Sequence, residues 1–402
     1  MKLAPIVLFT YNRPWHTQQT IEALQKNELA KESELFIFSD GGKDEASWVK
    51  VNEVREYLKT INSFKKVILI FQDKNIGLAD SIISGVTKIV NQYGKIIVLE
   101  DDHVTNKFFL KFMNDALNFY ENEEKVWHIS GWNYPIKCEN LNKTFLWRVM
   151  NCWGWATWKD RWQNYEKNPQ KLIENFTKEE ISIFNLDNIA NYYEQIVKNL
   201  NGSLDTWAVF WYATIFKNNG LCLNPVRSFV ENIGLDDTGT TTSLNSNYSN
   251  NLEYDTSNID FEKNIQENNL YEDKIKLFYL NSQNHNILFS KYINKIFDFL
   301  KTLQSGSEKY ILYGSGTGME LVLSQIPNDK ILFIIDKNLK KHNSYIKNIR
   351  IISLEYLKTF DDGNGKIIIT VFGRGDRIST MLENEYSIDK KRIIILDILD
   401  TY

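Results

Sequence analysis

Short apolar runs alternate with stretches of helical character from Pro5 to about Gly131. Brief runs rich in β-branched and aromatic residues are typical of buried strands. The strands predicted in this way are residues 6–10, 35–39, 67–71, 96–99 and 126–130. Because helical segments separate continuous apolar strands, the pattern predicts an α/β fold with a mostly parallel sheet covered by helices on both faces.

Polar segments follow these strands at the point where each strand ends. They are Thr10-Tyr11-Asn12-Arg13, Asp40-Gly41-Gly42, Gln72-Asp73-Lys74-Asn75 and Glu100-Asp101-Asp102. In open α/β sheets, ligands bind at the carboxyl ends of the strands. We therefore expect the four segments to meet at one edge of the sheet and to form a binding site there.

The three consecutive carboxylates Glu100, Asp101 and Asp102 are the most informative of these segments. Adjacent carboxylates repel one another unless a cation or several donors lie between them, and a metal–diphosphate site is built in this way. The alternative is a solvated turn between a strand and a helix, with Asp102 or Thr105 as the helix N-cap. The rest of the chain has to decide between the two.

Beyond residue 131 the pattern changes. Residues 132–235 are dense in tryptophan and tyrosine, with helical periodicity at 204–216, and residues 238–257 have the polar composition of a flexible loop. An amphipathic stretch at 289–303 carries an apolar face of Ile293, Ile296, Phe297, Leu300 and Leu303. A second β-α-β pattern starts at residue 309. We predict a first domain at 1–245, a linker and helical connector at 246–305, and a smaller Rossmann-like α/β domain at 306–402.

Composition limits the possible functions. A length of 402 residues predicts two or three domains, and 43% hydrophobic residues suffice for packed cores. The net charge of −4 gives no general attraction to nucleic acid. Cys138, Cys152 and Cys222 fit neither a disulfide framework nor a zinc site and favour a reducing compartment. Without a recognisable signal segment or spanning run, we expect a cytoplasmic protein, with peripheral attachment to the inner face of the membrane left open.

An ordered set of motifs in residues 4–240 resembles the GT-A glycosyltransferases, a nucleotide-sugar-dependent class that includes N-acetylglucosaminyltransferase I and many bacterial surface-glycan enzymes. The motifs are Phe9-Thr10-Tyr11-Asn12-Arg13-Pro14, Ser39-Asp40-Gly41, Asn75-Ile76-Gly77-Leu78, Glu100-Asp101-Asp102, and Trp153-Gly154-Trp155 with Trp158 and Trp162. The resemblance implies an inverting transferase that moves a hexosyl or N-acetylhexosaminyl group from a nucleoside-diphosphate sugar, foremost a UDP-sugar. The implied acceptor is a hydroxyl of a polysaccharide or lipid-linked glycan, and the implied cofactor is Mn²⁺ or Mg²⁺.

The resemblance places the donor along the first strand exits. Arg13 would stabilise the departing phosphate, Asp40 would accept from a nucleobase N–H, and Gly77 would open a helix N-terminus to the ligand. Asp102 would bind the metal ion. The donor-binding residues expected from the resemblance are Thr10, Tyr11, Asn12, Arg13, Asp40, Lys74, Asn75, Gly77, Glu100 and Asp101. The alternatives are a surface arginine before a helix that Pro14 begins and an ordinary turn at Asp40.

Asp205 is the expected catalytic base, because its segment resembles a Trp-Asp-Asp-Trp segment of the family. Thr206 stands where the family has its second acid, and the alternative is that Asp205 is a helix N-cap. Trp153, Gly154 and Trp155 are expected to form a platform for the acceptor or the sugar, with core packing as the alternative.

A loop at 232–240 resembles one that closes over the donor in related bacterial sequences, and its Asp236 and Asp237 are the alternative bases. Thr241 stands where a histidine is expected as a further metal ligand. His103 is an alternative metal ligand.

In the C-terminal domain, the run Gly314-Ser315-Gly316-Thr317-Gly318-Met319 precedes a helix, and Asp336 ends the next strand. This spacing is similar to that of a dinucleotide-binding fold, although Met319 replaces the third glycine. Nucleotide binding and a structural or dimerising role both stay open.

Two rival functions remain for the chain. One is a nucleotidyltransferase that makes sugar nucleotides, which should carry a glycine-rich basic loop after the first strand. The other is a non-catalytic glycan-binding or scaffold protein.

Overall fold

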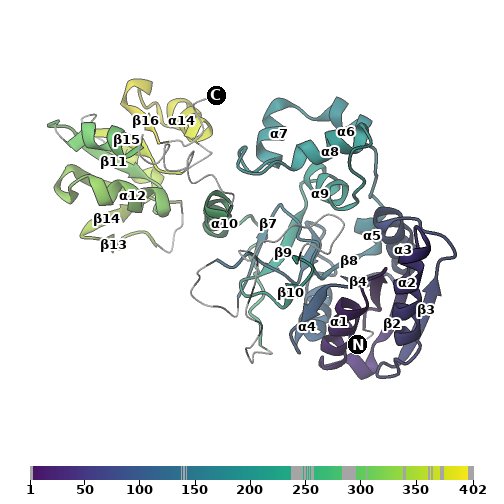
Figure 1. Cartoon of the computed structure of the whole chain (residues 1–402). Coiled ribbons are helices and arrows are strands. Elements are labelled where there is room, and N and C mark those ends of the chain that lie inside the picture. The colour runs from purple at the N-terminus through teal and green to yellow at the C-terminus, as the bar shows by residue number, and fades with distance from the viewer. Residues whose placement is uncertain are drawn as a thin grey trace. The chain divides into compact units, whose positions relative to one another are not determined.

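The computed structural model describes residues 3–136, 138, 141, 143–236, 248, 250, 252, 254, 258–282, 296–304, 306–337, 341–360, 363, 365–371 and 375–396. The chain forms two compact units, one of Met1–Phe184 with Asn191–Asn268 and one of Asn185–Ala190 with Asn269–Tyr402 (Figure 1). Most of the loop predicted at 238–257 and residues 289–295 of the amphipathic stretch lie outside the described residues.

The first unit is built on an eight-stranded sheet with the order β3-β2-β1-β4-β8-β6-β9-β7. The strands are β1 Ile6–Thr10, β2 Glu34–Ser39, β3 Lys66–Phe71, β4 Lys95–Glu100, β6 Val126–Ser130, β7 Thr144–Trp147, β8 Trp155–Trp158 and β9 Leu221–Pro225. The first four strands in this order are parallel, whereas β8 runs antiparallel to β4 and β6. The predicted α/β class is confirmed, and each predicted strand lies within one residue of its observed bounds.

Helices surround this sheet. They are α1 Pro14–Gln25, α2 Glu45–Leu58, α3 Leu78–Tyr93, α4 Phe109–Phe119, α5 Lys159–Trp162, α6 Pro169–Asn175, α7 Lys178–Phe184, α8 Tyr192–Leu200 and α9 Ala208–Lys217. Helix α3 packs closely on β1, since the ring of Phe9 lies 2.7 Å from the position that a Cβ at Gly85 would take. Pro14 is the first residue of α1, as the sequence predicts.

A short antiparallel ribbon follows directly after the acidic triplet. It consists of β5 His103–Thr105 and β10 Val230–Asn232, with His103 paired to Asn232. The alternative that Asp102 or Thr105 caps a helix is therefore wrong, because the backbone after Asp102 is extended and paired. Helix α4 begins only at Phe109.

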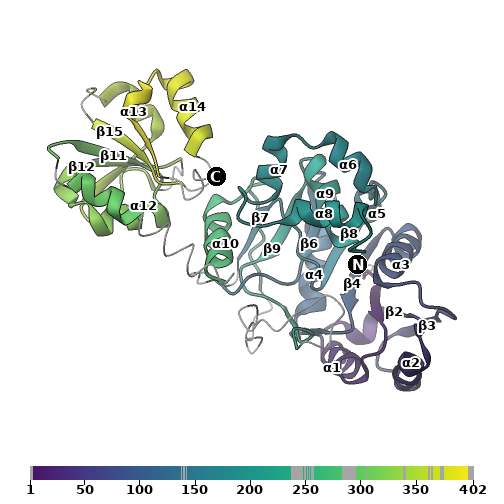
Figure 2. The same cartoon turned by 45° about the horizontal axis from the view of Figure 1, so that its top comes forward.

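The second unit contains a six-stranded sheet with the order β13-β14-β12-β11-β15-β16. Its strands are β11 Lys309–Tyr313, β12 Ile331–Ile335, β13 Tyr345–Ile346, β14 Ile349–Ile352, β15 Gly365–Ile369 and β16 Ile393–Ile395. Its helices are α10 Asn269–Ser282, α12 Thr317–Gln325, α13 Leu354–Phe360 and α14 Gly375–Tyr386 (Figure 2). All strand pairs except β13·β14 are parallel, which confirms the predicted Rossmann-like class.

Alternate residues of β11 enter two separate cores of the second unit. Tyr310 and Leu312 pack with residues of α12, whereas Ile311 and Tyr313 pack with residues of α13 and α14. Helices therefore cover both faces of this sheet. Residues 296–304 are helical, and their Ile296 and Leu300 are buried in the α12-side core, in agreement with the predicted apolar face.

The segment Asn185–Ala190 belongs to the second unit although the chain on both sides of it belongs to the first. Its Asp187 forms an ion pair with Lys276 of α10, which also contacts Glu272 at 3.0 Å. All three side chains are almost completely buried.

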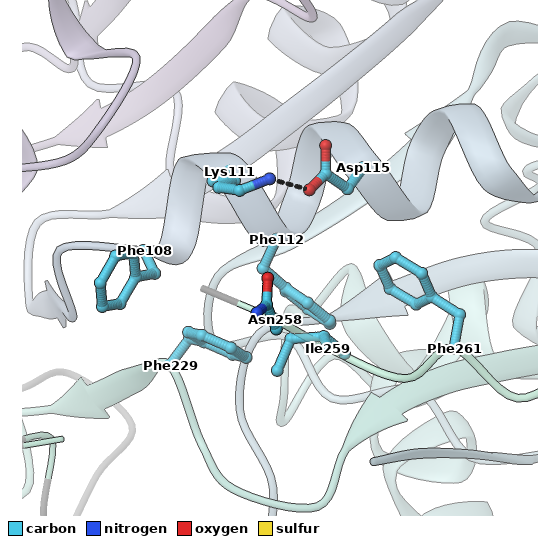
Figure 3. Close-up of a pocket in the computed structure, with 8 residues that line it drawn as sticks. All are labelled: Phe108, Lys111, Phe112, Asp115, Phe229, Asn258, Ile259 and Phe261. Atoms are coloured by element: carbon cyan, nitrogen blue, oxygen red, sulfur yellow. Dashed lines mark hydrogen bonds and ion pairs between the residues drawn. The ribbon is translucent and has the colours of Figure 1, made fainter. Parts of the chain in front are cut away.

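A pocket of about 190 Å³ lies beside α4 (Figure 3). Phe108, Phe112, Phe229 and Phe261 line it, and the ion pair between Lys111 and Asp115 spans 2.5 Å at its wall. None of these residues belongs to the predicted site. Within the part of the chain that the structure describes, no helix has the length and apolar character that crossing a bilayer requires.

Candidate active site

The carboxyl ends of β2, β1 and β4 lie side by side because β1 pairs in parallel with both neighbours. Thr10 is paired with Ser39, and Phe9 is paired with Glu100. This register brings the polar segments after β1, β2 and β4 to one edge of the sheet, and β3 adds the segment 72–75. The structure thus brings together the four segments that the sequence pattern singled out.

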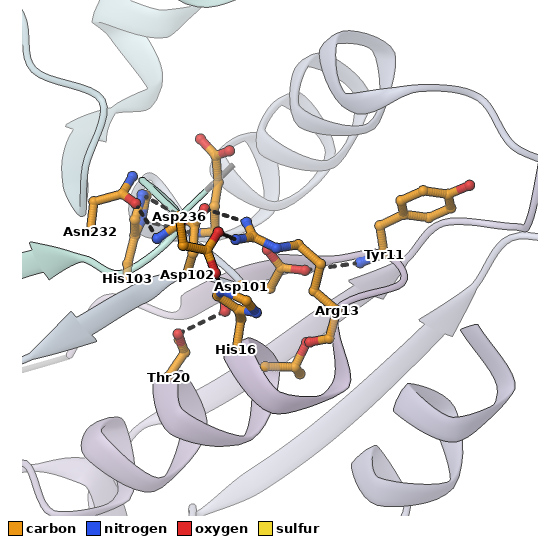
Figure 4. A network of polar contacts seen from close by, with 12 residues as sticks. Tyr11, Arg13, His16, Thr20, Asp101, Asp102, His103, Asn232 and Asp236 are labelled. Atoms are coloured by element: carbon orange, nitrogen blue, oxygen red, sulfur yellow. Dashed lines mark hydrogen bonds and ion pairs between the residues drawn. The ribbon is translucent and has the colours of Figure 1, made fainter. Parts of the chain in front are cut away.

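Arg13 lies at the centre of a network of charged side chains (Figure 4). Its Nη1 donates to Asp102 Oδ2 at 2.7 Å, and both side chains are largely buried. Its Nη2 lies 3.4 Å from Asp236 Oδ1, while Asp236 Oδ2 lies 3.0 Å from His16 Nε2. Sequence analysis did not select His16, although its position in the first turn of α1, three residues after Arg13, is the signal that could have found it.

The backbone after β10 lies over Asp102. The N–H of Ile233 donates to the Asp102 carbonyl oxygen at 2.9 Å. A Cβ at Gly234 would lie 2.0 Å from Asp102 Oδ2, so this close approach requires glycine. Residues 232–236 therefore cover the carboxylate expected to bind the metal ion. Asp237 and Thr241 lie outside the described residues.

The two other acids of the triplet have raised pKa values. Burial is the main cause for both, and the neighbouring Asp102 carboxylate adds to it, while Arg13 acts in the opposite direction. The pKa of Asp101 rises from 3.8 to about 7, and the pKa of Glu100 lies well above its usual value. Asp101 Oδ2 also accepts from the N–H of Tyr11 at 3.3 Å. Both shifts favour the protonated form of these two acids.

His103 is oriented by the backbone of the triplet. Its Nδ1 accepts from the N–H of Glu100 at 3.0 Å, so the ring proton of the neutral form is on Nε2, which lies 3.5 Å from Asp102 Oδ1. Burial lowers the pKa of His103 to about 4. Because neither ring nitrogen has a free lone pair in this arrangement, His103 orients Asp102 here and does not offer a ligand atom.

Asp40 holds the turn before α3. Its Oδ1 accepts from the N–H groups of Gly41 and Ile76 at 2.8 and 3.0 Å, and its Oδ2 accepts from the Gly77 N–H and Asn75 Nδ2 at 2.9 and 3.0 Å. A carboxylate has about four acceptor positions. In this structure the protein itself fills them, so Asp40 shapes the Asn75–Gly77 turn and has no acceptor left for a nucleobase N–H.

Arg55 of α2 is a second residue that sequence analysis missed. It donates to the carbonyl oxygens of Ser39, Asp40 and Gln72 at 3.1, 3.2 and 2.7 Å. These contacts hold the carboxyl ends of β2 and β3 at a fixed spacing. No motif marks this arginine, because it acts on backbone groups that only the folded sheet brings together.

The other expected donor residues occupy the same edge. The hydroxyl of Thr10 is buried and donates to the Phe38 carbonyl at 3.4 Å. Asn12 is partly buried and Lys74 is exposed. The backbone of Lys74 runs so close to Gly41 that a Cβ there would lie 2.5 Å from the Lys74 carbonyl carbon.

The segment before β8 brings the aromatic motif to the acids. Trp155 pairs with Val98 in the antiparallel register, which places Trp153 opposite Glu100 when the register is continued. Gly154 has φ +62, and a Cβ there would meet the side chains of Leu99 and Val230. Trp153 is partly buried, with its ring 4.6 Å from that of Trp132. Trp153 and Gly154 therefore lie next to the acidic triplet.

Trp155 itself is fully buried. Its ring stacks between Trp207 at 5.2 Å and His128 at 5.4 Å. In this structure it belongs to the core and has no surface with which to contact a sugar.

Asp205 has an exposed side chain that forms an ion pair with Lys167. It is not the N-cap of α9, because that helix begins at Ala208 and Trp207 precedes it. Burial raises the pKa of Tyr165, and the carboxylates of Asp205 and Asp80 raise it further. Asp205 and Asp80, which lies in the first turn of α3, thus each act on the charge of Tyr165. Among the described residues, no hydrogen bond or ion pair connects Asp205 to the Arg13 network.

The described residues contain no group of three or more His, Cys, Asp and Glu side chains arranged to hold a metal ion. The chemistry of the triplet nevertheless fits Mn²⁺ or Mg²⁺, since both ions prefer hard oxygen ligands and three carboxyl groups follow one another here. In the present arrangement Asp102 Oδ2 is engaged by Arg13.

The glycine-rich turn of the second unit contacts the acid at the end of β12. Ser315 Oγ is hydrogen-bonded to Asp336, and Lys341 Nζ lies 2.7 Å from Ser315 Oγ and 3.4 Å from Asp336 Oδ2. Met319, which replaces the third glycine, is buried in the core beneath α12.

No protein-family model and no curated protein matches the sequence. Among solved structures, the chain is similar to the mannosyltransferase PcManGT from Pyrobaculum calidifontis in complex with GDP-Man and Mn²⁺, at 7% identity and a TM-score of 0.32, over 55% of this chain and 70% of that one. It is also similar to S. aureus TarS 1-349, at 13% identity and a TM-score of 0.34, over 75% and 80% of the two chains. A third similar structure is the apo form of mouse xyloside xylosyltransferase 1. It has 11% identity and a TM-score of 0.26, over 54% of this chain and 82% of that one. These similarities are too low to carry an argument, so the function has to be argued from the site.

Proposed function

We propose that this chain is a metal-dependent GT-A glycosyltransferase. It would move a hexosyl or N-acetylhexosaminyl group from a nucleoside-diphosphate sugar, foremost a UDP-sugar, to a hydroxyl of a polysaccharide or lipid-linked glycan, with inversion. One observation carries the proposal: three consecutive acids, Glu100, Asp101 and Asp102, lie beside Arg13 at the carboxyl edge of a parallel sheet. A divalent cation and a diphosphate together balance such a set of charges.

The residues at this edge have separate roles in holding the donor. A divalent cation on Asp102 would neutralise charge on the diphosphate as it leaves. Arg13 would donate to the same phosphates. The Asn75–Gly77 turn, which Asp40 and Arg55 hold in place, presents the N-terminus of α3 to the donor, where free N–H groups favour an anionic or polyhydroxyl ligand.

The acceptor would bind on the side of Trp153. A partly exposed indole can contact the C–H face of a sugar ring. Asp205 would take the proton from the attacking hydroxyl, and its exposed carboxylate is open to an acceptor.

Sugar transfer from a panel of UDP-, GDP- and dTDP-sugars, with products identified by mass spectrometry, tests the proposal. Transfer to a glycan acceptor that EDTA stops would support it. Formation of a sugar nucleotide from a nucleoside triphosphate and a sugar phosphate would favour the nucleotidyltransferase, although the first strand exit lacks the glycine that such an enzyme needs. Glycan binding without either reaction would favour a binding module.

A further inference from the structure

We infer that Arg13 and His16 together bind the donor's diphosphate, and that Asp236 is an internal anion which the diphosphate displaces. The inference depends on the proposed function, because it names the groups that hold the donor's phosphates. It adds His16 and Asp236 to the site. It also explains the contact between Asp236 and α1, since Asp236 would occupy the position of the diphosphate when no donor is bound.

Two side chains at the start of α1 converge on one carboxylate. Arg13 Nη2 lies 3.4 Å from Oδ1 of Asp236, and His16 Nε2 lies 3.0 Å from Oδ2 (Figure 4). Two oxygens of one anionic group are therefore contacted by two different side chains. A phosphate presents its oxygens in a comparable way, and guanidinium groups pair with carboxylates and phosphates through the same fork of donors.

The backbone at this position also favours an anion. Arg13 is the N-cap of the 12-residue helix α1, and His16 is in its first turn. The unpaired N–H groups and the positive end of the helix dipole add to the attraction of the two side chains. No acidic residue is present in this first turn to provide a negative charge from within the helix.

Of the two carboxylates that contact Arg13, Asp236 has the longer contact and the more exposed side chain. Its side chain is 39% exposed and its oxygen lies 3.4 Å from the guanidinium, whereas Asp102 is 12% exposed and lies at 2.7 Å. Partly exposed ion pairs of this kind contribute little to stability. A diphosphate has more charge and more acceptor oxygens than one carboxylate, so it competes effectively for the same donors.

Asp236 could instead assist anion binding by orienting Arg13, and this role predicts the opposite effect of its removal. If Asp236 served to hold Arg13 in a productive orientation, its removal would weaken the binding of an anion. If it occupies the anion's place, its removal strengthens binding. The sign of one measured change therefore separates the two roles.

The test is calorimetric titration of inorganic pyrophosphate into the full chain in the presence of Mn²⁺. Asp236→Asn should tighten pyrophosphate binding about tenfold because the competing charge is removed. His16→Ala should weaken it about tenfold, and His16→Gln should retain most of the affinity, since an amide N–H can replace the imidazole donor. Asp115→Asn is the matched control, because Asp115 is 36% exposed and paired with Lys111 in a different part of the first unit.

Unchanged or weaker binding in Asp236→Asn would overturn the displacement. Normal binding in a folded His16→Ala variant would remove His16 from the site. If that variant does not fold, normal binding in His16→Leu, which has no hydrogen-bonding group, would do the same. Binding that no variant alters would be that of an adventitious ion only. If the pyrophosphate results are as expected but no nucleotide sugar is turned over, the anion site is supported and the glycosyltransferase proposal fails. If sugar is transferred but no variant changes pyrophosphate binding, the glycosyltransferase proposal is supported and the anion site fails.

Discussion

Arg13 and Asp102 are 89 positions apart in the sequence, yet an ion pair of 2.7 Å joins them at the edge of the sheet. The pair exists because β1 and β4 are direct neighbours in the sheet, so that the residues following them emerge together. One member is the expected phosphate ligand and the other is the expected metal ligand. The donor's phosphates and the cation would therefore bind to Arg13 and Asp102, which already contact each other in this structure.

Replacing Asp102 by Asn should abolish metal-dependent transfer, with turnover reduced at least about 100-fold, because the amide carries no charge for the cation. The fold should persist, since Arg13 keeps its contact with Asp236. Product formation at saturating donor and a range of Mn²⁺ concentrations measures the effect. Unchanged turnover would show that the cation binds elsewhere.

Asp205→Asn should lower turnover by roughly 100-fold while the affinity for the donor stays the same, because a general base acts on the acceptor and not on the nucleotide. Single-turnover rates and donor titrations separate the two quantities. Lys167→Met is an informative companion, since it removes the ion-pair partner and keeps the carboxylate. Normal rates in Asp205→Asn would move the base to Asp236 or Asp237.

Gly234→Ala should displace the segment that covers Asp102, because the added Cβ would lie 2.0 Å from the carboxylate oxygen. We expect a loss of roughly 1–3 kcal/mol in the free energy of unfolding of the first unit, as for other overpacked sites. Asp115→Asn is the control in the same unit, because it alters only a partly exposed side chain paired with Lys111. All 11 tryptophans lie in the first unit, so their fluorescence follows its unfolding. Equal stability of the two variants would contradict the close contact.

Asp40→Asn should destabilise the Asn75–Gly77 turn, because one of the two oxygens that accept four donors becomes a donor itself. Leaving buried N–H groups unpaired costs about 1–3 kcal/mol, and the cost here should be at the lower end because these groups are partly buried. Hydrogen exchange of the Ile76 and Gly77 amides should speed up, whereas exchange elsewhere should not. If the exchange of these two amides is unaltered, the turn does not depend on the carboxylate.

His128 should make the first unit less stable in acid. Its Nδ1 accepts from Trp211 Nε1 and its Nε2 contacts the Asn151 carbonyl, and burial lowers the pKa from 6.5 to about 3. Between these two pH values the unfolded chain binds a proton that the folded chain does not. Stability is therefore present in full above pH 6.5 and is lost as the pH falls toward 3, by at most about 1.4 kcal/mol per pH unit.

The measurement is urea unfolding of wild type and His128→Gln at pH 7 and pH 5, followed by tryptophan fluorescence. The variant should lose less stability between the two pH values, because glutamine does not titrate there. The raised pKa values of Glu100 and Asp101 act in the opposite direction but are common to both proteins. Equal losses would show that His128 is not the group responsible.

The elements that the sequence predicted are those whose signal is local. The strands at 6–10 and 96–99 contain continuous apolar runs, and Pro14 marks the first residue of α1. The ribbon of β5 and β10 could not be predicted, because His103–Thr105 becomes a strand only by pairing with residues more than a hundred positions away.

The same distinction holds for the site. The four polar segments after the strands could be predicted to form one site, because the carboxyl ends of parallel strands lie at the same edge of a sheet. Two features of the site depend on how distant segments pack. Backbone N–H groups occupy the acceptor positions of the Asp40 carboxylate, and Trp155 lies inside the core. Composition does not distinguish a tryptophan at a binding surface from one in the interior.

The hexapeptide Asn185–Ala190 limits how the gene can be divided. A stop codon after Asn268 would delete Lys276, and the Asp187 carboxylate, which is 11% exposed in the intact chain, would lose the ammonium that balances it. Expressing the first unit by itself therefore calls for a neutral residue at 187 or for a shortened connection between α7 and α8.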